Sequence, residues 1–207
     1  MYQPAPFRST DPAVAAELMR GYPLASLIST DEEGLPFVTH LPLHLHEVDG
    51  RQVLLGHCAK PNPHWRYLAE RPRALVTFMG PQGYLSPRVY PDLQRVPSWN
   101  YLAVHCRVQA RLIEEPSAKD ALLKQLIADH EPAYAAQWRG LGEEFAGRML
   151  AGIVGFELEI TDVACKLKLN QHRPESHAAL YAAYAAGDEQ ARALASWMEK
   201  LGLEVRP

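Results

Sequence analysis

The sequence predicts an α+β fold dominated by an antiparallel β-barrel, with peripheral and C-terminal helices packed on its outside. Three observations support this prediction. Short runs of strand-forming residues, separated by Gly-, Pro- and Asp-containing turns, fill the first half of the chain. These runs follow one another without the intervening helices that a doubly wound parallel sheet requires. Helical patterns gather instead at the N-terminus, in one insert and at the C-terminus. We expect a single domain over residues 1–207 with six or seven strands.

The first half is expected to begin with a short helix and to continue as strands. Pro12 suits the first turn of a helix that runs to about Arg20, and the preceding residues Ser9, Thr10 and Asp11 can cap it. A second short helix is expected after Pro63. The strands are predicted at 24–30, 37–48, 53–57, 74–79 and 84–90, with tight turns at 31–34, 49–50 and 80–83.

The second half predicts two long strands with a helical insert between them. The strands are expected at 101–113 and 153–160, and the insert at 117–150. Ser117 and Asp120 have the spacing of a capping box at the start of the insert. Alanine-rich helices are expected at 175–202, broken at Gly187–Asp188. Both helical regions should pack on the barrel.

Composition excludes several classes of protein. The net charge of −3 gives no electrostatic argument for nucleic-acid binding. The sequence contains no apolar run of 18 residues and no signal-peptide pattern, so we expect a cytoplasmic protein that does not span a membrane. Its three cysteines, Cys58, Cys106 and Cys165, are too few and too far apart for a disulfide framework, and they are expected to be reduced and mostly buried.

The segment 56–65 joins the end of a strand to the start of a helix. Amide groups at such a corner favour an anion, Lys60 adds a positive charge, and Asn62 adds a side-chain amide. A phosphate group would fit this corner, although a solvated turn explains the same residues. Cys58 is a weak candidate nucleophile, because neighbours on a strand point to opposite faces and His57 would point away from it.

Three histidines share a parity in the segment 36–46. His40, His44 and His46 would lie on one face of a strand, where they could bind a metal. However, Pro42 interrupts that face, and no carboxylate or cysteine joins the set at a familiar ligand spacing. We therefore predict no metal site. Backbone groups freed by Pro42 could instead contact the edge of a planar heteroaromatic ring.

Aromatic and amide side chains occupy 98–101, at the start of the strand expected at 101–113. Trp99 and Tyr101 share a parity, while Ser98 and Asn100 could hydrogen-bond to ring heteroatoms. A packed aromatic strand start is the alternative interpretation.

The most basic stretch of the chain is 166–174. Lys166 and Lys168 alternate there with apolar residues. The stretch could face an anion, or it could form a solvated strand edge on which lysines discourage aggregation. The residues alone do not separate these two interpretations.

Taken together and in order, these segments resemble the PaiB family of FMN-binding negative transcriptional regulators. The matching pieces are 1–4 with Phe7, 39–42, 56–65, 80–87 with Tyr90, 96–101 with 104–105, and 166–174. They span nearly the whole chain. The chain departs from the family where Lys60 replaces the more usual arginine and where His64 replaces glutamine. Positive charge is kept at Lys60, so an anion site survives.

The resemblance implies a split barrel of the pyridoxamine-phosphate-oxidase type that binds FMN at the interface of a homodimer. By this analogy, Lys60 and Asn62 would contact the FMN phosphate. The remaining cofactor-binding residues implied are His40, Leu41 and Pro42 along the isoalloxazine, Gly56, His57 and Cys58 along the ribityl chain, Trp65 beside them, and Trp99 and Asn100 from the partner subunit.

The resemblance leaves the activity open. A flavin-dependent oxidoreductase is one hypothesis, although no catalytic acid or base stands out. A transcriptional regulator is a second, without a helix-turn-helix or a basic recognition helix to support it. An interaction module without turnover is a third. A haem-binding split barrel is a fourth, with His40, His57 and His105 as candidate axial ligands.

Overall fold

The computed structural model describes residues 1–92 and 94–204. Its centre is an antiparallel eight-stranded sheet with the order β3-β2-β6-β7-β8-β5-β4, and β1 pairs with β8 outside this path. The strands are β1 (Arg8–Ser9), β2 (Leu24–Thr30), β3 (Pro36–Pro42), β4 (His44–Val48), β5 (Arg51–Ala59), β6 (Arg73–Leu85), β7 (Ser98–Ile113) and β8 (Ile153–Lys168). The α-helices are α1 (Pro12–Gly21), α2 (His64–Glu70), α3 (Pro116–His130), α4 (Ala135–Gly140), α5 (Glu143–Ala151), α6 (His177–Ala185) and α7 (Glu189–Lys200).

Contacts divide the chain into two compact units. Unit 1 comprises Met1–Gly21, Met79–Val104 and the segment from Ala164 onward, and unit 2 comprises Tyr22–Phe78 and His105–Val163. Strands β6, β7 and β8 pass through both units, so neither unit is a continuous piece of sequence.

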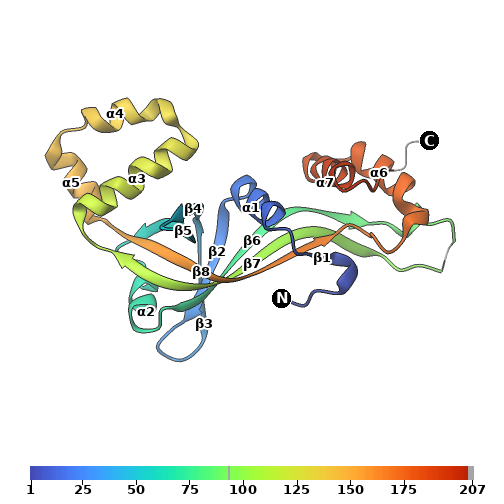
Figure 1. Cartoon of the computed structure of the whole chain (residues 1–207), viewed down its shortest axis with the longest axis horizontal. Helices are drawn as coiled ribbons and strands as arrows, with labels where there is room; N and C mark the ends of the chain where they lie inside the picture. The colour runs from blue at the N-terminus through green and yellow to red at the C-terminus, as the bar shows by residue number, and fades with distance from the viewer. Residues whose placement is uncertain (93, 205–207) are drawn as a thin grey trace. The chain divides into compact units, whose positions relative to one another are not determined.

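Unit 2 contains two hairpins whose turns follow the predicted turn chemistry. The Asp31 carboxylate accepts hydrogen bonds from the backbone N–H groups of Glu33 and Leu35, and so fixes the turn between β2 and β3. Asp49 and Gly50 both have positive φ, 52° and 75°, as a two-residue turn between β4 and β5 requires. Helices α3, α4 and α5 form the insert between β7 and β8 (Figure 1).

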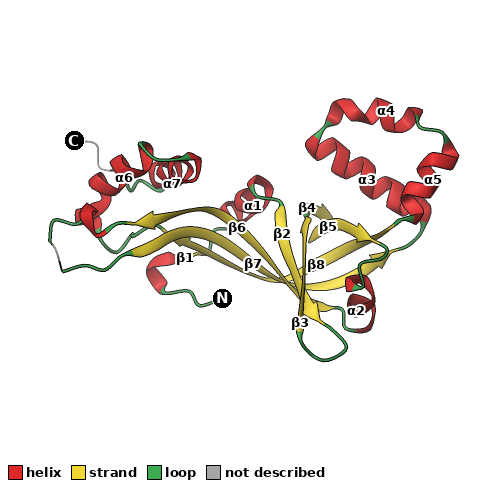
Figure 2. Ribbon diagram, turned by 180° about the vertical axis from the view of Figure 1, so that it is seen from behind, coloured by secondary structure: helices red, strands yellow, loops and turns green. Residues whose placement is uncertain are grey.

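Unit 1 contains helices α1, α6 and α7, of which α6 and α7 lie side by side (Figure 2), whereas α2 belongs to unit 2. The predicted break between them is confirmed, because the Asp188 carboxylate caps α7 by accepting a hydrogen bond from the Ala191 N–H at 2.8 Å. A Cβ on Gly80 would lie 3.1 Å from Leu18 of α1 and 3.2 Å from the Leu102 carbonyl oxygen. Helix α1 thus packs closely on the sheet at this glycine.

Several strand predictions are wrong. The sheet has eight strands instead of six or seven, the strand expected at 84–90 ends with β6 at Leu85, and the strand expected at 153–160 continues to Lys168 as β8. The expected strand 37–48 is two strands, β3 and β4, separated at Leu43. They pair with different neighbours, β3 with β2 and β4 with β5, so the chain has to leave one ladder before it joins the other. The expected turn at 80–83 lies inside β6. Pro81 is tolerated there because β2 pairs only with Leu75–Thr77 of β6, which leaves that side of the strand free further along.

The predicted capping box is also wrong. Glu115 is the N-cap residue of α3, Pro116 occupies its first turn, and no side chain caps the helix. The Asp120 carboxylate instead accepts a hydrogen bond from the Trp138 indole at 2.9 Å and pairs with Lys124 at 2.5 Å. Asp120 therefore joins α3 to α4.

Candidate functional site at the end of strand β5

A hydrogen-bonded triad of side chains builds the corner between β5 and α2. The Asn62 amide donates to the Thr39 hydroxyl at 3.1 Å, and its oxygen accepts from the His64 N–H at 3.0 Å. The His64 Nδ1 atom lies 2.7 Å from the same Thr39 hydroxyl oxygen. Asn62 is therefore a structural residue of this corner, with one amide hydrogen left for another acceptor.

His64 is fully buried beneath the corner. Its ring packs edge-on against Phe37 at 5.1 Å, and its Nε2 atom has no hydrogen-bond partner among the described residues. Burial lowers the pKa of His64 to about 4. The ring is consequently neutral at physiological pH and contributes shape and hydrogen bonding rather than charge.

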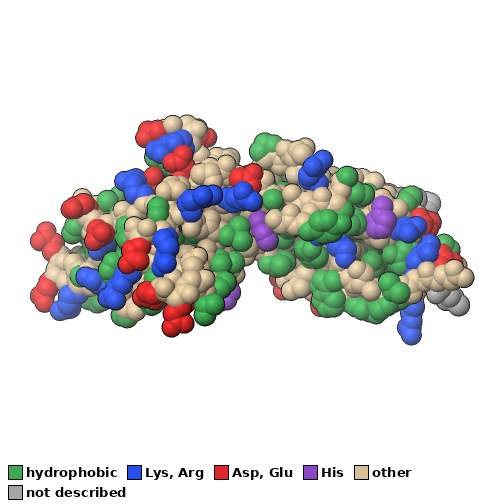
Figure 3. Space-filling model, turned by 90° about the horizontal axis from the view of Figure 1, so that it is seen from below, with side chains coloured by type: hydrophobic (Ala, Val, Ile, Leu, Met, Phe, Trp, Pro, Cys, Tyr) green, Lys and Arg blue, Asp and Glu red, His purple; other side chains and the backbone are tan. Residues whose placement is uncertain are grey.

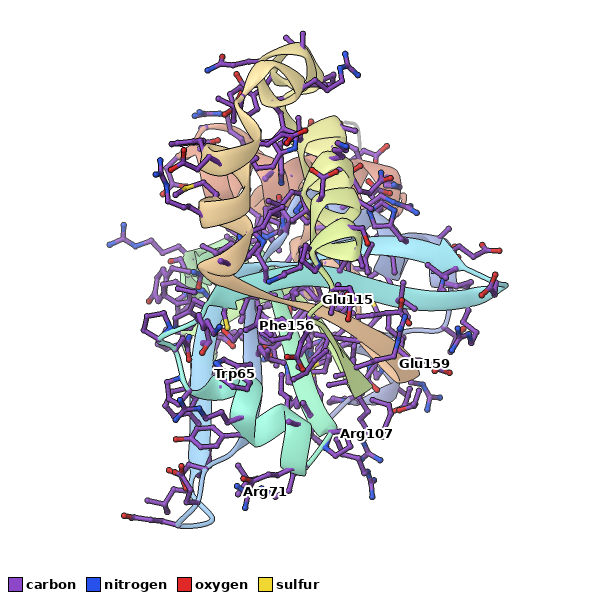
Figure 4. The ribbon with its side chains drawn as sticks, turned by 90° about the vertical axis from the view of Figure 1, so that its left-hand side faces the viewer. Trp65, Arg71, Arg107, Glu115, Phe156 and Glu159 are labelled. Carbon is purple, nitrogen blue, oxygen red and sulfur yellow. The ribbon has the colours of Figure 1, made fainter. Side chains whose placement is uncertain are left out.

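Cys58 is a structural thiol of the same corner. Burial raises its pKa to about 11, although a hydrogen bond from the Trp65 backbone N–H lowers it in part. A thiol of this kind is protonated at neutral pH and is a poor nucleophile. Trp65 also donates its indole N–H to the Lys60 carbonyl oxygen at 3.0 Å, so α2 is fastened to the end of β5; Figure 4 shows Trp65 near the start of this helix.

Two cations at the corner carry no counter-charge. Lys60 and Arg66 are exposed, and neither takes part in an ion pair within the described part of the chain. The Arg66 guanidinium lies 5.2 Å from the centre of the Trp65 ring. His57 adds an unpaired buried Nδ1 atom, and burial lowers the pKa of its ring. This donor set suits a phosphate group bound next to a neutral polar chain.

Gly56 allows the end of β3 to lie against β5. A Cβ at this position would lie 2.5 Å from Leu43, 2.9 Å from the Pro42 carbonyl oxygen and 3.5 Å from Leu41. Any side chain would push these segments apart. The structure thus brings together two segments that the sequence analysis connected with one ligand, 40–42 and 56–58.

The three residues at the end of β3 differ in exposure. His40 is exposed, and its Nδ1 atom lies 3.0 Å from the Ser26 hydroxyl oxygen. Leu41 is buried in the core, while Pro42 is exposed. His40 and Pro42 therefore present the accessible surface of this segment.

Trp99 and Asn100 belong to unit 1. Trp99 is exposed, and its indole N–H donates to the Gln82 side chain at 3.1 Å. Asn100 is fully buried, and its amide donates to the Tyr184 hydroxyl at 3.0 Å. Of the two residues, only Trp99 presents surface to another molecule.

The other histidines of the 36–46 segment hold the helical insert. His44 and His46 both contact the Asp129 carboxylate, at 3.2 and 3.0 Å, and His44 Nε2 lies 3.2 Å from His130 Nε2. A search of the described residues finds no group of three or more side chains arranged to hold a metal ion. These contacts fasten the end of α3 to β4.

A groove elsewhere in unit 2 has the wrong charge for a phosphate. It encloses about 470 Å³ beside the start of α3. Its buried Glu157 carboxylate is already paired with Arg111 at 2.8 Å, and Glu47, Glu114 and Glu115 add further negative charge. The charge of the lining side chains thus favours the corner around Lys60 over this groove as a phosphate site.

Comparison with known proteins identifies the family. Residues 1–162 match a family model described as "Putative FMN-binding domain". The chain is also 33% identical over 181 residues to the protease synthase and sporulation protein PAI 2 of Bacillus subtilis, a match that covers 85% of this chain and 84% of that protein. The chain belongs to the PaiB family. An uncharacterized yeast protein, YKL070W, is 32% identical over 100 residues, which are 45% of this chain and 58% of that protein.

Solved structures support the same fold for this PaiB-family chain. The FAD and heme binding protein from Mycobacterium smegmatis has a TM-score of 0.62 at 22% identity, covering 78% of this chain and 73% of that one. The flavocytochrome Anf3 from Azotobacter vinelandii has a TM-score of 0.60 at 18% identity, covering 78% of this chain and 69% of that one. The chain is an FMN-binding protein with the split-barrel fold.

Sequence reasoning missed two residues of the corner. Thr39 was noticed only as part of a family motif, yet its hydroxyl joins Asn62 to His64. Arg66 was not singled out, although it follows Trp65 directly and an arginine beside an exposed aromatic ring is a recognisable signal for stacking.

Proposed function

We propose that unit 2 binds FMN with its phosphate at the Lys60 corner. The single observation that carries this proposal is the pair of exposed, uncompensated cations, Lys60 and Arg66, on a corner that hydrogen bonds among Thr39, Asn62 and His64 hold in place. Charge-assisted hydrogen bonds from such cations to a phosphate are among the stronger ones in proteins. Asn62 supports the site mainly by holding the corner in place.

The flavin ring system would extend from this corner along the end of β3. His40 and Pro42 supply the accessible surface there, with Leu41 packed beneath it. Gly56 and His57 would run beside the ribityl chain, where the unpaired Nδ1 atom of His57 meets a hydroxyl group. The exposure of His40 and Pro42 and the hydrogen-bonding capacity of His57 support this placement.

When bound, FMN supplies redox chemistry, and the residues of the corner bind and orient it. The chain's own titratable groups at the corner do not relay protons at neutral pH. His64 is neutral and buried, and the Cys58 thiol is protonated. We therefore propose binding, with flavin-dependent oxidoreductase activity as its extension, and assign no catalytic residue.

We further propose that the chain acts as a homodimer in the cytoplasm. Edge strand β3 exposes Val38, and the adjoining β2 exposes Leu24, two apolar side chains available to a second copy. Trp99 is the residue we expect a partner subunit to present to the flavin. In the described residues, no helix has the length and apolarity to cross a membrane.

Direct transcriptional regulation has less support. Helix α3 mixes acidic and basic residues, and the face in Figure 3 likewise intersperses blue and red side chains. DNA binding through phosphates would need a concentrated basic surface. A gel-shift titration at low salt tests this role, and binding that weakens steeply with added salt would support it.

The test of the flavin proposal is an FMN titration followed by fluorescence quenching, beside the absorbance spectrum of the purified protein. Lys60→Ala and Arg66→Ala should each weaken FMN binding about 10-fold or more, because each removes a charge-assisted bond. Arg139→Ala, which removes an exposed cation of unit 2 far along the chain, should leave it unchanged. Equal affinities in all four proteins would overturn the phosphate corner, and a Soret band would point to haem instead.

A further inference from the structure

Unit 1 gathers three cations on one side of its sheet. Lys166 and Lys168 alternate along β8, so their side chains share a face. Arg8 of β1 lies directly opposite Lys166 in the antiparallel register, which places it on that face as well. No ion pair within residues 1–92 and 94–204 involves any of the three.

Lys166 is the most unusual member of this group. Lys166 is only 7% exposed, yet no carboxylate of residues 1–92 and 94–204 forms an ion pair with it. Its ammonium group instead lies 5.1 Å from the centre of the Tyr101 ring and 5.8 Å from that of Tyr2. Burying a charge without a counter-charge is unfavourable. A folded protein that keeps such a group has a use for it beyond stability.

Lys168 is held in a fixed position beside Lys166. Its ammonium group donates to the Ser98 hydroxyl at 2.8 Å and to the Trp99 carbonyl oxygen at 2.6 Å. It also lies 5.9 Å from the centre of the Tyr101 ring. Burial lowers the pKa of Lys168; the nearby Tyr101 raises it, and the charge of Lys166 lowers it again. The two ammonium groups, both near the Tyr101 ring, repel each other, and an anion bound between them would offset this repulsion.

Aromatic surface adjoins these cations. Trp99 and Tyr101 alternate along β7 and project to the same side of that strand. Trp99 is 47% exposed and packs edge-on against Tyr84 at 6.1 Å. A ligand bound at the ammonium groups would therefore find an aromatic ring to stack on.

We propose that Arg8, Lys166, Lys168 and Tyr101, here called the lysine face, bind an anionic ligand whose phosphate or carboxylate group is carried on an aromatic ring. The anionic group contacts the ammonium groups of Lys166 and Lys168, and the ring packs towards Trp99. The four residues of the lysine face are separate from those of the Lys60 corner, although Trp99 also belongs to the proposed flavin site of the homodimer.

The experiment is isothermal titration calorimetry of the full chain, with and without FMN. The probes are phenyl phosphate, benzoate and inorganic phosphate. Phenyl phosphate or benzoate should bind more tightly than inorganic phosphate, and the better of the two identifies the anionic group. Lys166→Met and Lys168→Gln should each weaken that binding about 10-fold or more. Arg88→Gln, a change at an exposed cation of unit 1, is the matched control and should have no effect.

A second measurement keeps the test independent of folding defects. Lys166→Met removes an uncompensated buried charge, so it should raise the Tm without ligand and abolish the rise in Tm that the aromatic anion gives the native chain. The proposal is overturned if no probe binds, or if both lysine variants bind the probes as the native chain does. It is also overturned if those variants lose only FMN binding. Loss of FMN binding in Lys60→Ala, with probe binding intact, supports two separate sites.

Discussion

The two units differ in the solvent exposure of two lysines, Lys60 and Lys166, that form no ion pair among the described residues. At the corner of unit 2, Lys60 is exposed beside Thr39, Asn62 and His64, whose side chains hydrogen-bond to one another. On the lysine face of unit 1, Lys166 is itself buried, and its ammonium group lies near the rings of Tyr101 and Tyr2. An exposed cation is hydrated and costs the fold little, whereas a buried one weakens it. Substitution of Lys60 should therefore change binding alone, while substitution of Lys166 should change stability as well.

The largest expected difference in stability is between alanine substitutions at two glycines, one in each unit. Gly56→Ala places a Cβ 2.5 Å from Leu43 and 2.9 Å from the Pro42 carbonyl oxygen, and backbone cannot move as easily as a side chain. We expect a loss of about 3 kcal/mol or more in the free energy of unfolding, measured by urea denaturation, together with loss of FMN binding.

Gly83→Ala is the counterpart in unit 1. Its Cβ would lie 2.9 Å from the end of the Leu194 side chain, which can rotate away, so the expected loss is about 1 kcal/mol. Gly147→Ala in α5 has open space around it and should stabilise slightly. A Gly56 variant as stable as the Gly147 variant would show that β3 does not approach β5 as closely as described.

Acid should weaken the corner through His64. Its folded-state pKa of about 4 lies below the unfolded value of 6.5, so the stability it contributes is complete above pH 6.5 and is lost as the pH falls towards 4. The loss should be on the order of 3 kcal/mol, measured as urea midpoints between pH 7 and pH 4.

His64→Gln is the matched variant, because glutamine can keep the contact with Thr39 without titrating. It should flatten this part of the pH dependence. If native and variant chains lose stability equally over the same range, the acid sensitivity belongs to other groups. His44 is the principal alternative, since burial and the neighbouring His130 lower its pKa despite Asp129.

In unit 1, the buried pair of Asn100 and Tyr184 should show the cost of a broken polar contact. The Tyr184 hydroxyl accepts from Asn100 and donates to the Tyr84 carbonyl oxygen at 3.3 Å. Tyr184→Phe leaves the Asn100 amide without its acceptor, so we expect a loss of about 2 kcal/mol. Adding Asn100→Leu should restore part of it, because the orphaned group is removed. A thermal double-mutant cycle measures the coupling, and strictly additive losses would show that the two side chains do not interact.

Local chemistry predicted those parts of the fold that depend on neighbouring residues. The Asp49–Gly50 turn, the helix break at Gly187–Asp188 and helix α2 are confirmed, because each is set by residues within a few positions. The split of 37–48 and the continuous strand β6 were not predictable in this way. Both depend on which distant strand supplies the pairing partner, and Pro81 is acceptable only because β2 does not extend that far.

The candidate site shows the same division. The sequence indicated the segments 40–42 and 56–62, and the family assignment confirms FMN as the ligand of the chain. The individual contacts of the cofactor remain predictions. The part that Asn62 plays in holding the corner was hidden, because it depends on Thr39, which lies 23 positions earlier. The burial of Asn100 was hidden too, since its partner Tyr184 is 84 positions away.

The smallest expected difference in stability is between alanine substitutions near the N-termini of two helices, one in each unit. Asp188 accepts a hydrogen bond from the Ala191 N–H and places a negative charge at the start of α7, so Asp188→Ala should cost about 1 kcal/mol. Ser117, the predicted cap of α3, lies inside that helix and caps nothing. Ser117→Ala should therefore change stability by less than about 0.5 kcal/mol. Urea denaturation of both variants decides between the two caps. If Ser117→Ala lost more stability than Asp188→Ala, the result would mean that Ser117 caps α3, as the sequence pattern predicted.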